Sequence, residues 1–426
     1  MVFLDSELLK YLIYSQHEVI QNEVLVPRSV EFEPNDNYVL VGMRRAGKTS
    51  ILYQLIQKLI EKGVDWEQIV FLNFEDERLI NIKLEELDKI TLVAQSLTKK
   101  PIYYFFDEIQ NIDGWEHFAR RLADQKQHVF ITGSNSKMLS TDIIASLGGR
   151  YMMKRITPYD FKEYLLANDV KYDKNSIYIP SKLTKILKYS DQYLHFGGLP
   201  ETLLQNNPRD YLNNIYQNIY LGDIIKRNQI RNPKALSLLI NKVAQVIMHE
   251  VSYNTLSKNV KATGVSISTP ATIDYLEFAK EAFLLFDVKN YVAKFSQKES
   301  TPKFYFCDNG ILNLFLFKKD TVLLENLVAV TLYNRFEKDV YYFHSKKTKI
   351  DLDFVVPSAE LAIQVAWQLD DFSREREVQS LIKLAQNSDE FTKFIIVTKD
   401  QNEKIIRDNL EIEVMPLHKF LLTYTK

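Results

Sequence analysis

The sequence predicts an α/β chain of several domains: a parallel sheet with a glycine-rich loop after its first strand, a helical lid, a winged helix and a second α/β domain. Three observations support this prediction. The chain has 426 residues, which exceeds one ordinary hydrophobic core. Short apolar runs alternate with helical stretches over residues 38–156. The glycine-rich segment from Gly42 to Thr49 directly follows the first of these runs.

Residues 1–160 form the first predicted domain, and a helix over 6–23 precedes its first apolar run. Because the apolar runs are continuous rather than alternating, they predict strands buried on both faces of a parallel sheet that helices cover. The expected strands are 38–41, 69–74, 102–106, 129–132 and 152–156, and the expected helices between them are 49–62, 84–97, 115–124 and 138–147.

Three further domains are expected after Pro158, which ends this alternation. Residues 161–233 are predicted to be helical and to form a lid. Residues 234–300 contain three helical stretches and two strand-like runs between 282 and 295, a pattern typical of a winged helix-turn-helix. Residues 301–426 mix strands with helices in a second α/β domain.

Composition and net charge limit the classes of partner that the chain is expected to bind. Hydrophobic residues make up 46% and charged residues 26% of the chain, as in ordinary globular proteins. The formal net charge is −1, so no global field attracts nucleic acid or anionic membrane, and any DNA contact needs a local basic patch. The single cysteine, Cys307, excludes internal disulfides and a cysteine-based zinc cluster.

The N-terminal residues and the hydropathy predict a cytoplasmic location. Residues 1–10 lack the basic region and the apolar core of a secretory signal. No apolar run approaches the roughly 18 residues that span a bilayer. We therefore expect no membrane contact.

The segment from Gly42 to Thr49 matches G-x-x-x-x-G-K-[ST], the pattern of a phosphate-binding loop. Its glycines let successive backbone N–H groups face an anion, and the following helix directs its positive end to the same place. Lys48 reaches the outer phosphates, and Thr49 offers its hydroxyl to Mg²⁺. Arg44 and Arg45 either touch the nucleotide or face a partner domain. The expected cofactor-binding residues are Gly42, Arg44, Arg45, Ala46, Gly47, Lys48, Thr49, Ser50 and Asp107.

The strand over 102–106 delivers Asp107 and Glu108 at its carboxyl end, where open α/β sheets bind ligands. Asp107 is expected to hold Mg²⁺ together with Thr49. Glu108 is expected to polarise the water that attacks the γ-phosphate. The alternative is a strand that ends in two solvated acids, and the phosphate-binding loop disfavours it.

Polar residues also follow the strand over 129–132. Ser134 or Asn135 is expected to sense the γ-phosphate and to position water, and the N-cap of a helix over 137–147 is the other interpretation. Arg150 has two interpretations. It is either a finger that reaches the nucleotide of a neighbouring subunit, which implies a homo-oligomer, or a cation that complements a helix C-terminus.

These motifs resemble a prokaryotic family of AAA+-type P-loop ATPases. Members of that family carry a winged helix and a C-terminal domain similar to the PD-(D/E)XK nucleases, a restriction-endonuclease-like fold. The resemblance implies an enzyme that depends on ATP and Mg²⁺, and it covers nearly the whole chain. Its motifs are residues 42–49, 107–110, 132–134, 149–150, 197–201 and 221–223.

The nuclease-like domain is expected to have lost catalysis. Such nucleases hold Mg²⁺ with an acid on a helix, an acid at a strand end, and an acid two residues before a lysine. The resemblance implies Glu325, Asp353 and Gln364 at these three positions. Gln364 is not an acid, and Ala366 stands where the lysine is expected. A lysine from elsewhere in the chain is the remaining route to an active site.

The predicted winged helix is ambiguous as a DNA reader. Its presumed recognition helix carries Asp274 and Glu277 against one basic residue, Lys280, which is poor for phosphate neutralisation. DNA binding and protein packing are therefore equal alternatives. A local basic patch would consist of Lys258, Lys261 and Lys289.

The sequence therefore predicts Mg²⁺-dependent ATP hydrolysis that switches the conformation of the lid, the winged helix and the C-terminal domain, with DNA as a candidate partner. Two alternatives stay open. One is a scaffold that holds its nucleotide for long periods and recruits a protein or a nucleic acid. The other is a nuclease gated by ATP.

Overall fold

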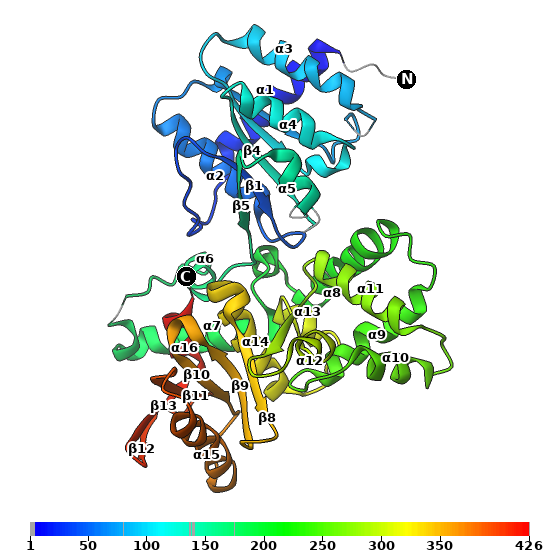
Figure 1. The fold of residues 1–426 in the computed structure, drawn as a ribbon. Helices are drawn as coiled ribbons and strands as arrows, with labels where there is room; N and C mark the ends of the chain where they lie inside the picture. Colours follow the sequence, from blue (N-terminus) through cyan, green and yellow to red (C-terminus); the bar gives the residue numbers. More distant parts are fainter. Residues whose placement is uncertain (1–4, 80, 136–137, 139–140, 174, 426) are drawn as a thin grey trace. The chain divides into compact units, whose positions relative to one another are not determined.

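The computed structural model describes residues 5–79, 81–135, 138, 141–173 and 175–425. The chain divides into two compact units, Met1–Thr157 and Pro158–Lys426. Each unit is built around its own sheet (Figure 1). The finer division of the second unit into lid, winged helix and nuclease-like domain stays a prediction.

The first unit contains a five-stranded sheet in the order β2-β3-β4-β1-β5, and all its strand pairs are parallel. The predicted parallel sheet is therefore confirmed. Strand β4 lies between β1 and β3, so the carboxyl ends of these three strands meet at one edge. The strands are β1 (Asn37–Val41), β2 (Ile69–Asn73), β3 (Tyr103–Asp107), β4 (His128–Gly133) and β5 (Tyr151–Arg155).

Helices cover both faces of this sheet (Figure 1). Apolar residues of α1 and α2, among them Ile20 and Ile56, join strand residues in one buried cluster. On the other face, Phe118 of α4 packs against Phe106 of β3. The helices are α1 (Ser6–Asn22), α2 (Lys48–Glu61), α3 (Leu87–Leu97), α4 (Trp115–Asp124) and α5 (Thr141–Leu147). The start of the helix predicted over 138–147 lies partly outside the described residues.

Aromatic side chains fill the centre of the first unit. The Phe130 ring stacks on Phe105 with centroids 5.0 Å apart and on Tyr38 at 5.9 Å. All three side chains are buried. Offset stacking of this kind adds to the hydrophobic term, so these residues fix the middle strands that carry the polar residues at their ends.

The second unit contains an eight-stranded mixed sheet in the order β12-β13-β11-β10-β9-β8-β6-β7. Three of its strand pairs, β10–β11, β11–β13 and β6–β8, are parallel, and the others are antiparallel. The strands are β6 (Leu285–Asn290), β7 (Lys303–Phe306), β8 (Tyr341–Ser345), β9 (Ile350–Val356), β10 (Leu361–Val365), β11 (Lys393–Thr398), β12 (Glu403–Arg407) and β13 (Leu410–Pro416).

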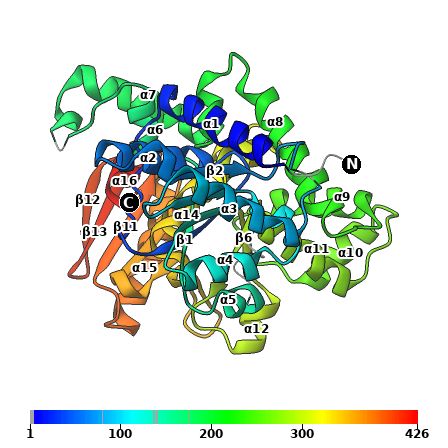
Figure 2. The ribbon, with the colours of Figure 1, turned by 90° about the horizontal axis from the view of Figure 1, so that it is seen from above.

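Helices of the second unit pack on this sheet and beside it. Leu381 and Leu384 of α15 are buried against one face of the sheet. Figures 1 and 2 both show α9, α10 and α11 gathered into one helical group. The helices are α6 (Phe161–Ala167), α7 (Pro180–Phe196), α8 (Pro208–Asn218), α9 (Pro233–Val246), α10 (Tyr253–Lys261), α11 (Thr269–Glu281), α12 (Phe295–Ser300), α13 (Asn309–Asn313), α14 (Asp320–Phe336), α15 (Asp371–Asn387) and α16 (Leu417–Tyr424).

Two expectations for the second unit are wrong in detail. The predicted hairpin between 282 and 295 does not form, because β6 pairs with β7 and the short helix α12 lies between them. The backbone N–H of Tyr291 instead donates to the carbonyl of Tyr342 in β8 (2.8 Å). The helix expected over 211–230 is also interrupted, because α8 continues into a π-helical stretch, Ile219–Lys226.

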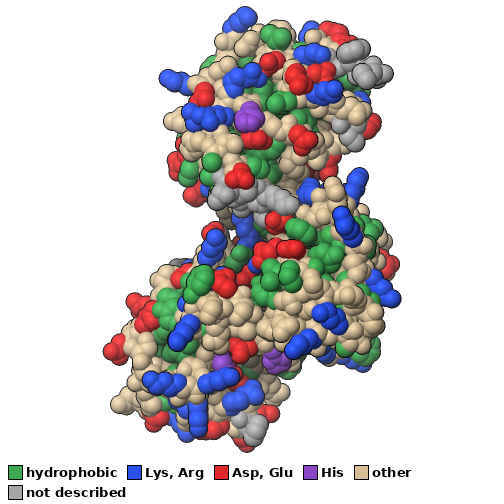
Figure 3. Space-filling view, turned by 45° about the vertical axis from the view of Figure 1, so that its right-hand side comes forward, with side chains coloured by type: hydrophobic (Ala, Val, Ile, Leu, Met, Phe, Trp, Pro, Cys, Tyr) green, Lys and Arg blue, Asp and Glu red, His purple; other side chains and the backbone are tan. Residues whose placement is uncertain are grey.

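The distribution of charged side chains on the surface agrees with the near-zero net charge. Figure 3 shows basic and acidic side chains interspersed over the face that it displays. Among the residues described, no helix has both the length and the apolar character needed to cross a bilayer.

Candidate nucleotide-binding site

The glycine-rich loop connects β1 to α2 at the carboxyl edge of the first sheet. Gly47 has φ of 92°, a left-handed conformation that glycine adopts at little cost, and it directly precedes Lys48, the first residue of α2. Gly42 lies against the end of the sheet, where an added Cβ would meet the carbonyl oxygen of Ile156 at 2.0 Å. Both glycines are therefore required by the backbone path. The loop aims backbone N–H groups and the start of a helix at one point.

Lys48 is buried inside this loop. Its ammonium donates to the carbonyls of Gly42 (3.1 Å) and Met43 (3.2 Å). It also lies 3.4 Å from Oε1 of Glu108. The Lys48 side chain is thus held over the loop by two carbonyls and one carboxylate, within reach of any anion that the loop binds.

Asp107 lies at the end of β3 and faces the loop. Its Oδ2 accepts a hydrogen bond from the Thr49 hydroxyl (2.9 Å), and its Oδ1 accepts one from the Thr132 hydroxyl. Burial raises the pKa of Asp107 to about 6, and the neighbouring Glu108 charge adds to this effect. A bound divalent cation would favour the ionised form. The structure therefore brings together the two predicted Mg²⁺ ligands, Thr49 and Asp107.

Glu108 has a left-handed backbone (φ 54°), which is uncommon outside glycine. Its carboxylate faces Lys48. Its Oε2 accepts hydrogen bonds from the Ser134 backbone N–H (3.1 Å) and from the Gln110 amide. Burial opposes ionisation of Glu108, but the Lys48 charge and the Gln110 hydrogen bond together hold its pKa below the ordinary value. Glu108 is therefore an ionised carboxylate before any ligand binds.

Ser134 and Asn135 follow β4 and are both buried. The Ser134 hydroxyl has no hydrogen-bond partner among the described residues. Buried hydroxyls are normally bonded, so an unpaired one at this edge of the sheet suits a ligand that brings its own acceptor or donor. The N-cap interpretation concerns a helix start that lies partly outside the described residues.

The predicted arginines occupy different places. Arg44 in the loop donates to Glu75 (3.1 Å), and Arg45 is exposed. Arg150 precedes β5, so it lies at the amino end of the parallel sheet, opposite the loop. There it forms an ion pair with Asp124. Arg150 therefore does not join the site of its own chain, and its role toward a second copy stays a prediction.

The residues present fit ATP and Mg²⁺. The loop offers N–H groups and a buried ammonium for phosphates. Thr49 and Asp107 offer the hard oxygen ligands that Mg²⁺ prefers. The Ser134 hydroxyl, which has no partner in the described part of the chain, and the ionised Glu108 lie on the same edge of the sheet. Each group thus has a chemical partner in a nucleotide bound with its cation.

The sequence predicted no role for two residues of this site. Gln110 donates to Glu108, and the only signal for it was its place in the 107–110 motif. Arg28 donates to the carbonyls of Ala46 in the loop (3.0 Å) and Thr157 (2.7 Å). No local pattern could have revealed Arg28, because both partners are distant in sequence.

The residues of the predicted nuclease-like site lie in the second unit. Glu325 on α14 and Asp353 on β9 both line one cavity. Gln364 on β10 does not act as a third acid: its Oε1 accepts from the Asp353 backbone N–H (2.9 Å), and its amide donates to Glu377 (2.7 Å). A lysine nevertheless reaches these acids. Lys303 on β7 lies 3.8 Å from Glu325 and 3.6 Å from Asp353.

Burial has the largest effect on the pKa values of the acids that line this cavity. It raises the pKa of Glu325 to about 8, with a further contribution from the Asp353 charge. Burial also raises the pKa of Asp353 and of Glu377. The carboxylates of Glu325 and Asp353 raise the pKa of Lys303, although its burial acts in the opposite direction. Lys303 is therefore a buried ammonium.

The predicted basic patch is partly neutralised, because Lys289 on β6 pairs with Glu299 (2.6 Å). Lys280 of the presumed recognition helix forms ion pairs with Glu277 (2.7 Å) and Asp287 (2.9 Å). The two remaining lysines of the predicted patch, Lys258 and Lys261, are exposed.

Comparison with known proteins identifies the class. Residues 34–165 match a family described as an AAA domain, and residues 187–321 match a domain of unknown function, DUF8612. With the phosphate loop and the paired acids at one sheet edge, the first unit is an AAA-type P-loop ATPase domain.

The whole chain has close relatives. An uncharacterized protein of Methanocaldococcus jannaschii is 34% identical over 432 residues, which cover 98% of this chain and 96% of that protein. This chain belongs to the same family as that archaeal protein. An uncharacterized protein of Haemophilus influenzae is 27% identical over 92% of this chain and 97% of its own length. A Walker-type ATPase of Pyrococcus abyssi, paby2304, matches with a TM-score of 0.38 and 14% identity over 72% of this chain and 95% of that chain, a similarity too low to inform the fold.

Proposed function

We propose that the first unit binds ATP with Mg²⁺ and hydrolyses it, and that the state of this site sets the conformation of the second unit. The observation that carries the proposal is the meeting of Lys48, Thr49, Asp107 and Glu108 at the carboxyl edge of one parallel sheet. Mg²⁺, when bound, neutralises charge on the phosphate oxygens. The remaining work falls to side chains of this chain.

Lys48 and the loop N–H groups bind the outer phosphates. Lys48 lies over the loop, and three acceptors fix its direction before a ligand arrives. Thr49 and Asp107 hold the cation, and their mutual hydrogen bond keeps the two oxygens adjacent. Thr132 holds the other oxygen of Asp107 and so orients the carboxylate.

Glu108 acts as the general base that takes a proton from the attacking water. Its low pKa keeps it ionised at neutral pH, as a base requires. Gln110 and the Ser134 backbone hold one oxygen, so the other is left to face Lys48. When Lys48 turns to phosphate, Glu108 loses its ion-pair partner and becomes free to bind water.

Ser134 is the proposed phosphate sensor, with Asn135 beside it. Its buried hydroxyl has no partner among the described residues, and a ligand at this edge of the sheet would supply one. Because β4 lies between β1 and β3, Ser134 is placed between the loop and the two acids. Arg150 would act on a second copy of the chain, since it cannot reach its own loop.

The conformational switch would act on the helical lid, the α9–α11 group and the C-terminal sheet. These elements would recruit a partner, with Lys258 and Lys261 as the available phosphate contacts if that partner is DNA. Two contacts support coupling inside the first unit. Gly42 lies against Ile156, and Arg28 bonds to both the loop and Thr157, the last residue before the second unit.

The Glu108→Gln variant tests the proposal. We expect nucleotide binding within about threefold of the wild type and turnover reduced by about a hundredfold or more, because general-base catalysis contributes on the order of 10²–10⁴. The matched control is Glu67→Gln, which removes an exposed acid of the same unit.

Unchanged turnover in Glu108→Gln would disprove the role of Glu108. Very slow turnover in the wild type, with nucleotide retained through purification, would favour the scaffold alternative instead. A pulldown with the ATP-trapped Glu108→Gln chain, read for both proteins and nucleic acids, identifies the class of partner.

A further inference from the structure

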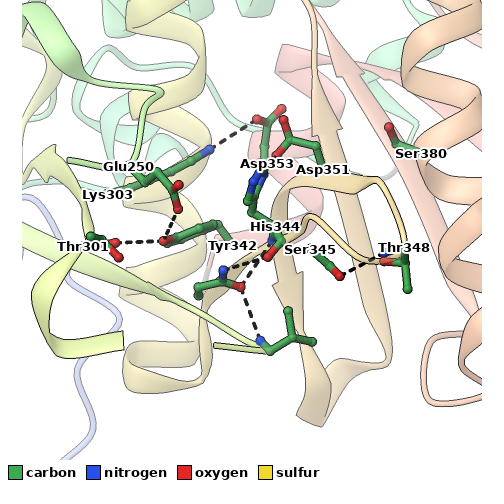
Figure 4. A network of polar contacts seen from close by, with 12 residues as sticks. Glu250, Thr301, Lys303, Tyr342, His344, Ser345, Thr348, Asp351, Asp353 and Ser380 are labelled. Carbon is green, nitrogen blue, oxygen red and sulfur yellow. Dashed lines mark hydrogen bonds and ion pairs between the residues drawn. The ribbon is translucent and has the colours of Figure 1, made fainter. Parts of the chain in front are cut away.

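The strand β12 forms one edge of the second sheet, and among the described residues it pairs only with β13. Figures 1 and 2 both show β12 at the outer margin of this sheet. The acidic cavity of the same unit, where Lys303 is directed at Asp353 of β9 (Figure 4), is separated from β12 by β13, β11 and β10. The edge is therefore a feature distinct from that cavity.

The backbone of β12 has hydrogen-bonding groups that face outward. The two-residue turn after it, 408–409, is left-handed at both positions (φ 51° and 62°), as in a type I′ hairpin turn. Such a turn is closed by a hydrogen-bonded pair, here Arg407 and Leu410. Because the direction of the N–H and C=O groups alternates along an antiparallel strand, the backbone groups of Lys404 and Ile406 point away from β13.

This edge lacks most of the features that keep sheet edges apart. Natural edges are protected by proline, bulges, covering segments or charged side chains. β12 contains no proline, and its register with β13 is continuous. Ile406 is 76% exposed, so no other segment covers it. Lys404 brings a charge to the edge, but its ammonium pairs with Glu411 of β13 (2.6 Å).

The face of β12 toward α15 carries one acid and one base. Glu403 pairs with Arg374 (2.7 Å), and Arg407 pairs with Glu375 (2.5 Å). Both partners lie in the first turns of α15. Ile405 lies between the two charged residues of β12 and packs against the apolar cluster of the sheet.

A second copy of this chain fits the edge with complementary charge. When two β12 strands run antiparallel about a two-fold axis at Ile405, Glu403 of each copy lies opposite Arg407 of the other. The same register places Lys404 opposite Ile406, so the outward backbone groups of the two strands meet and the lysine stem covers the exposed isoleucine. An axis at Lys404 would oppose two ammonium groups, and an axis at Ile406 would pair fewer residues of the strand.

We propose that β12 is a homodimer interface, in which two copies of the chain pair edge to edge and join their sheets into one. Each contact between Glu403 and Arg407 of different copies lies between the intrachain partners Arg374 and Glu375, so that the charges alternate along the row. The two-fold arrangement closes after two copies, because the other edge strand, β7, is buried. Interfaces below about 1,200 Å² are usually transient, so this short strand pair forms a reversible dimer.

Sedimentation of the full chain without nucleotide, from about 1 to about 200 µM, covers the range of such transient interfaces. We expect a monomer–dimer equilibrium. Ile406→Pro should be monomeric throughout, because proline removes an outward N–H group and leaves the β13 ladder intact. Its thermal midpoint should stay close to that of the wild type. The control Lys347→Glu, which reverses an exposed charge in the turn between β8 and β9, should dimerise normally.

Charge reversal tests the register. Glu403→Arg and Arg407→Glu each place like charges opposite one another in a homodimer, so each chain alone should dimerise at least about tenfold more weakly. In an equimolar mixture, the arginines of one chain face the glutamates of the other, and dimerisation should return to within about threefold of the wild type. Changes within one chain, such as the lost pair with Arg374, persist in the mixture, so recovery reports contacts between copies.

Three results would overturn the proposal. A wild-type chain that stays monomeric over the whole range would leave the edge to a strand of another protein. A dimer that Ile406→Pro leaves intact would form through a different surface. A mixture of the two charge-reversed chains that stays monomeric would exclude the contacts between Glu403 and Arg407. If Ile406→Pro does not fold, the mixture decides the question.

Discussion

The ammonium of Lys48 lies 3.4 Å from the carboxylate oxygen Oε1 of Glu108. The residue that would bind phosphate and the residue that would activate water therefore neutralise each other in the ligand-free chain. The pair is buried, so solvent screens it little. Any phosphate that binds must compete with Glu108 for Lys48.

Lys48→Ala should abolish nucleotide binding. It removes the buried ammonium and leaves Glu108 as an unpaired buried charge, which costs stability as well as affinity. We expect affinity for ATP to fall by about a hundredfold or more, measured by calorimetry or by a fluorescent nucleotide. The control is Lys58→Ala on the exposed side of α2. Retained affinity in Lys48→Ala would refute the binding role.

Ser134→Ala should slow hydrolysis without weakening binding. As a sensor, the hydroxyl would make its hydrogen bond chiefly in the transition state, so its loss corresponds to about tenfold in rate. Steady-state turnover and separately measured ATP affinity provide the test. Ser96→Ala is the matched control, because that hydroxyl only bonds within helix α3. Equal losses in affinity and turnover would contradict a sensor and indicate a general defect of the site.

Asn326→Leu should destabilise the second unit. The Asn326 side chain is fully buried, bonds to both backbone groups of Phe306 (2.9 and 3.0 Å) and donates to Asn309 (2.8 Å). Leucine leaves these partners unsatisfied, so we expect a loss of about 2–4 kcal/mol. Thermal or urea unfolding measures it, with Asn387→Leu, an exposed helical position, as control. Equal stability of the two variants would contradict the prediction.

The second unit should lose stability between about pH 4 and pH 7 through Asp308. This carboxyl accepts from the backbone N–H groups of Gly198, Gly310 and Ile311, yet burial raises its pKa from 3.8 to about 6. The folded chain thus retains a proton that the unfolded chain releases. That contribution is complete below about pH 4 and is lost as pH rises through about 6.

Asp308→Asn should remove this pH dependence while lowering stability throughout the range. Thermal midpoints of both chains between pH 4 and pH 7 provide the measurement. The wild-type midpoint should fall relative to that of the variant as pH rises. Parallel curves would show that Asp308 does not titrate in this range.

Local patterns were sufficient to predict the first unit. Continuous apolar runs predicted its strands, and the loop motif gave the position of Lys48 because loop, strand and helix are contiguous. The order of strands brought Ser134 between loop and acids, as expected from a polar end on an intervening strand.

Long-range pairing limited the prediction of the second unit. The expected hairpin was wrong because β6 pairs across α12 with β7, and no local signal specifies that partner. Lys303 reaches acids on α14 and β9 for the same reason. The absence of a lysine at position 366 therefore did not mean that no lysine lies beside Glu325 and Asp353.

Two hydrogen bonds of the Arg28 guanidinium connect the phosphate-binding loop to the last residue of the first unit. One nitrogen holds the carbonyl of Ala46 inside the phosphate-binding loop, and the other holds the carbonyl of Thr157, where the chain leaves the first unit. A rigid planar group cannot lengthen. A small shift of the loop would therefore displace the carbonyl of Thr157 as well. A large shift would break one of the two hydrogen bonds, and the loop and Thr157 would then move independently.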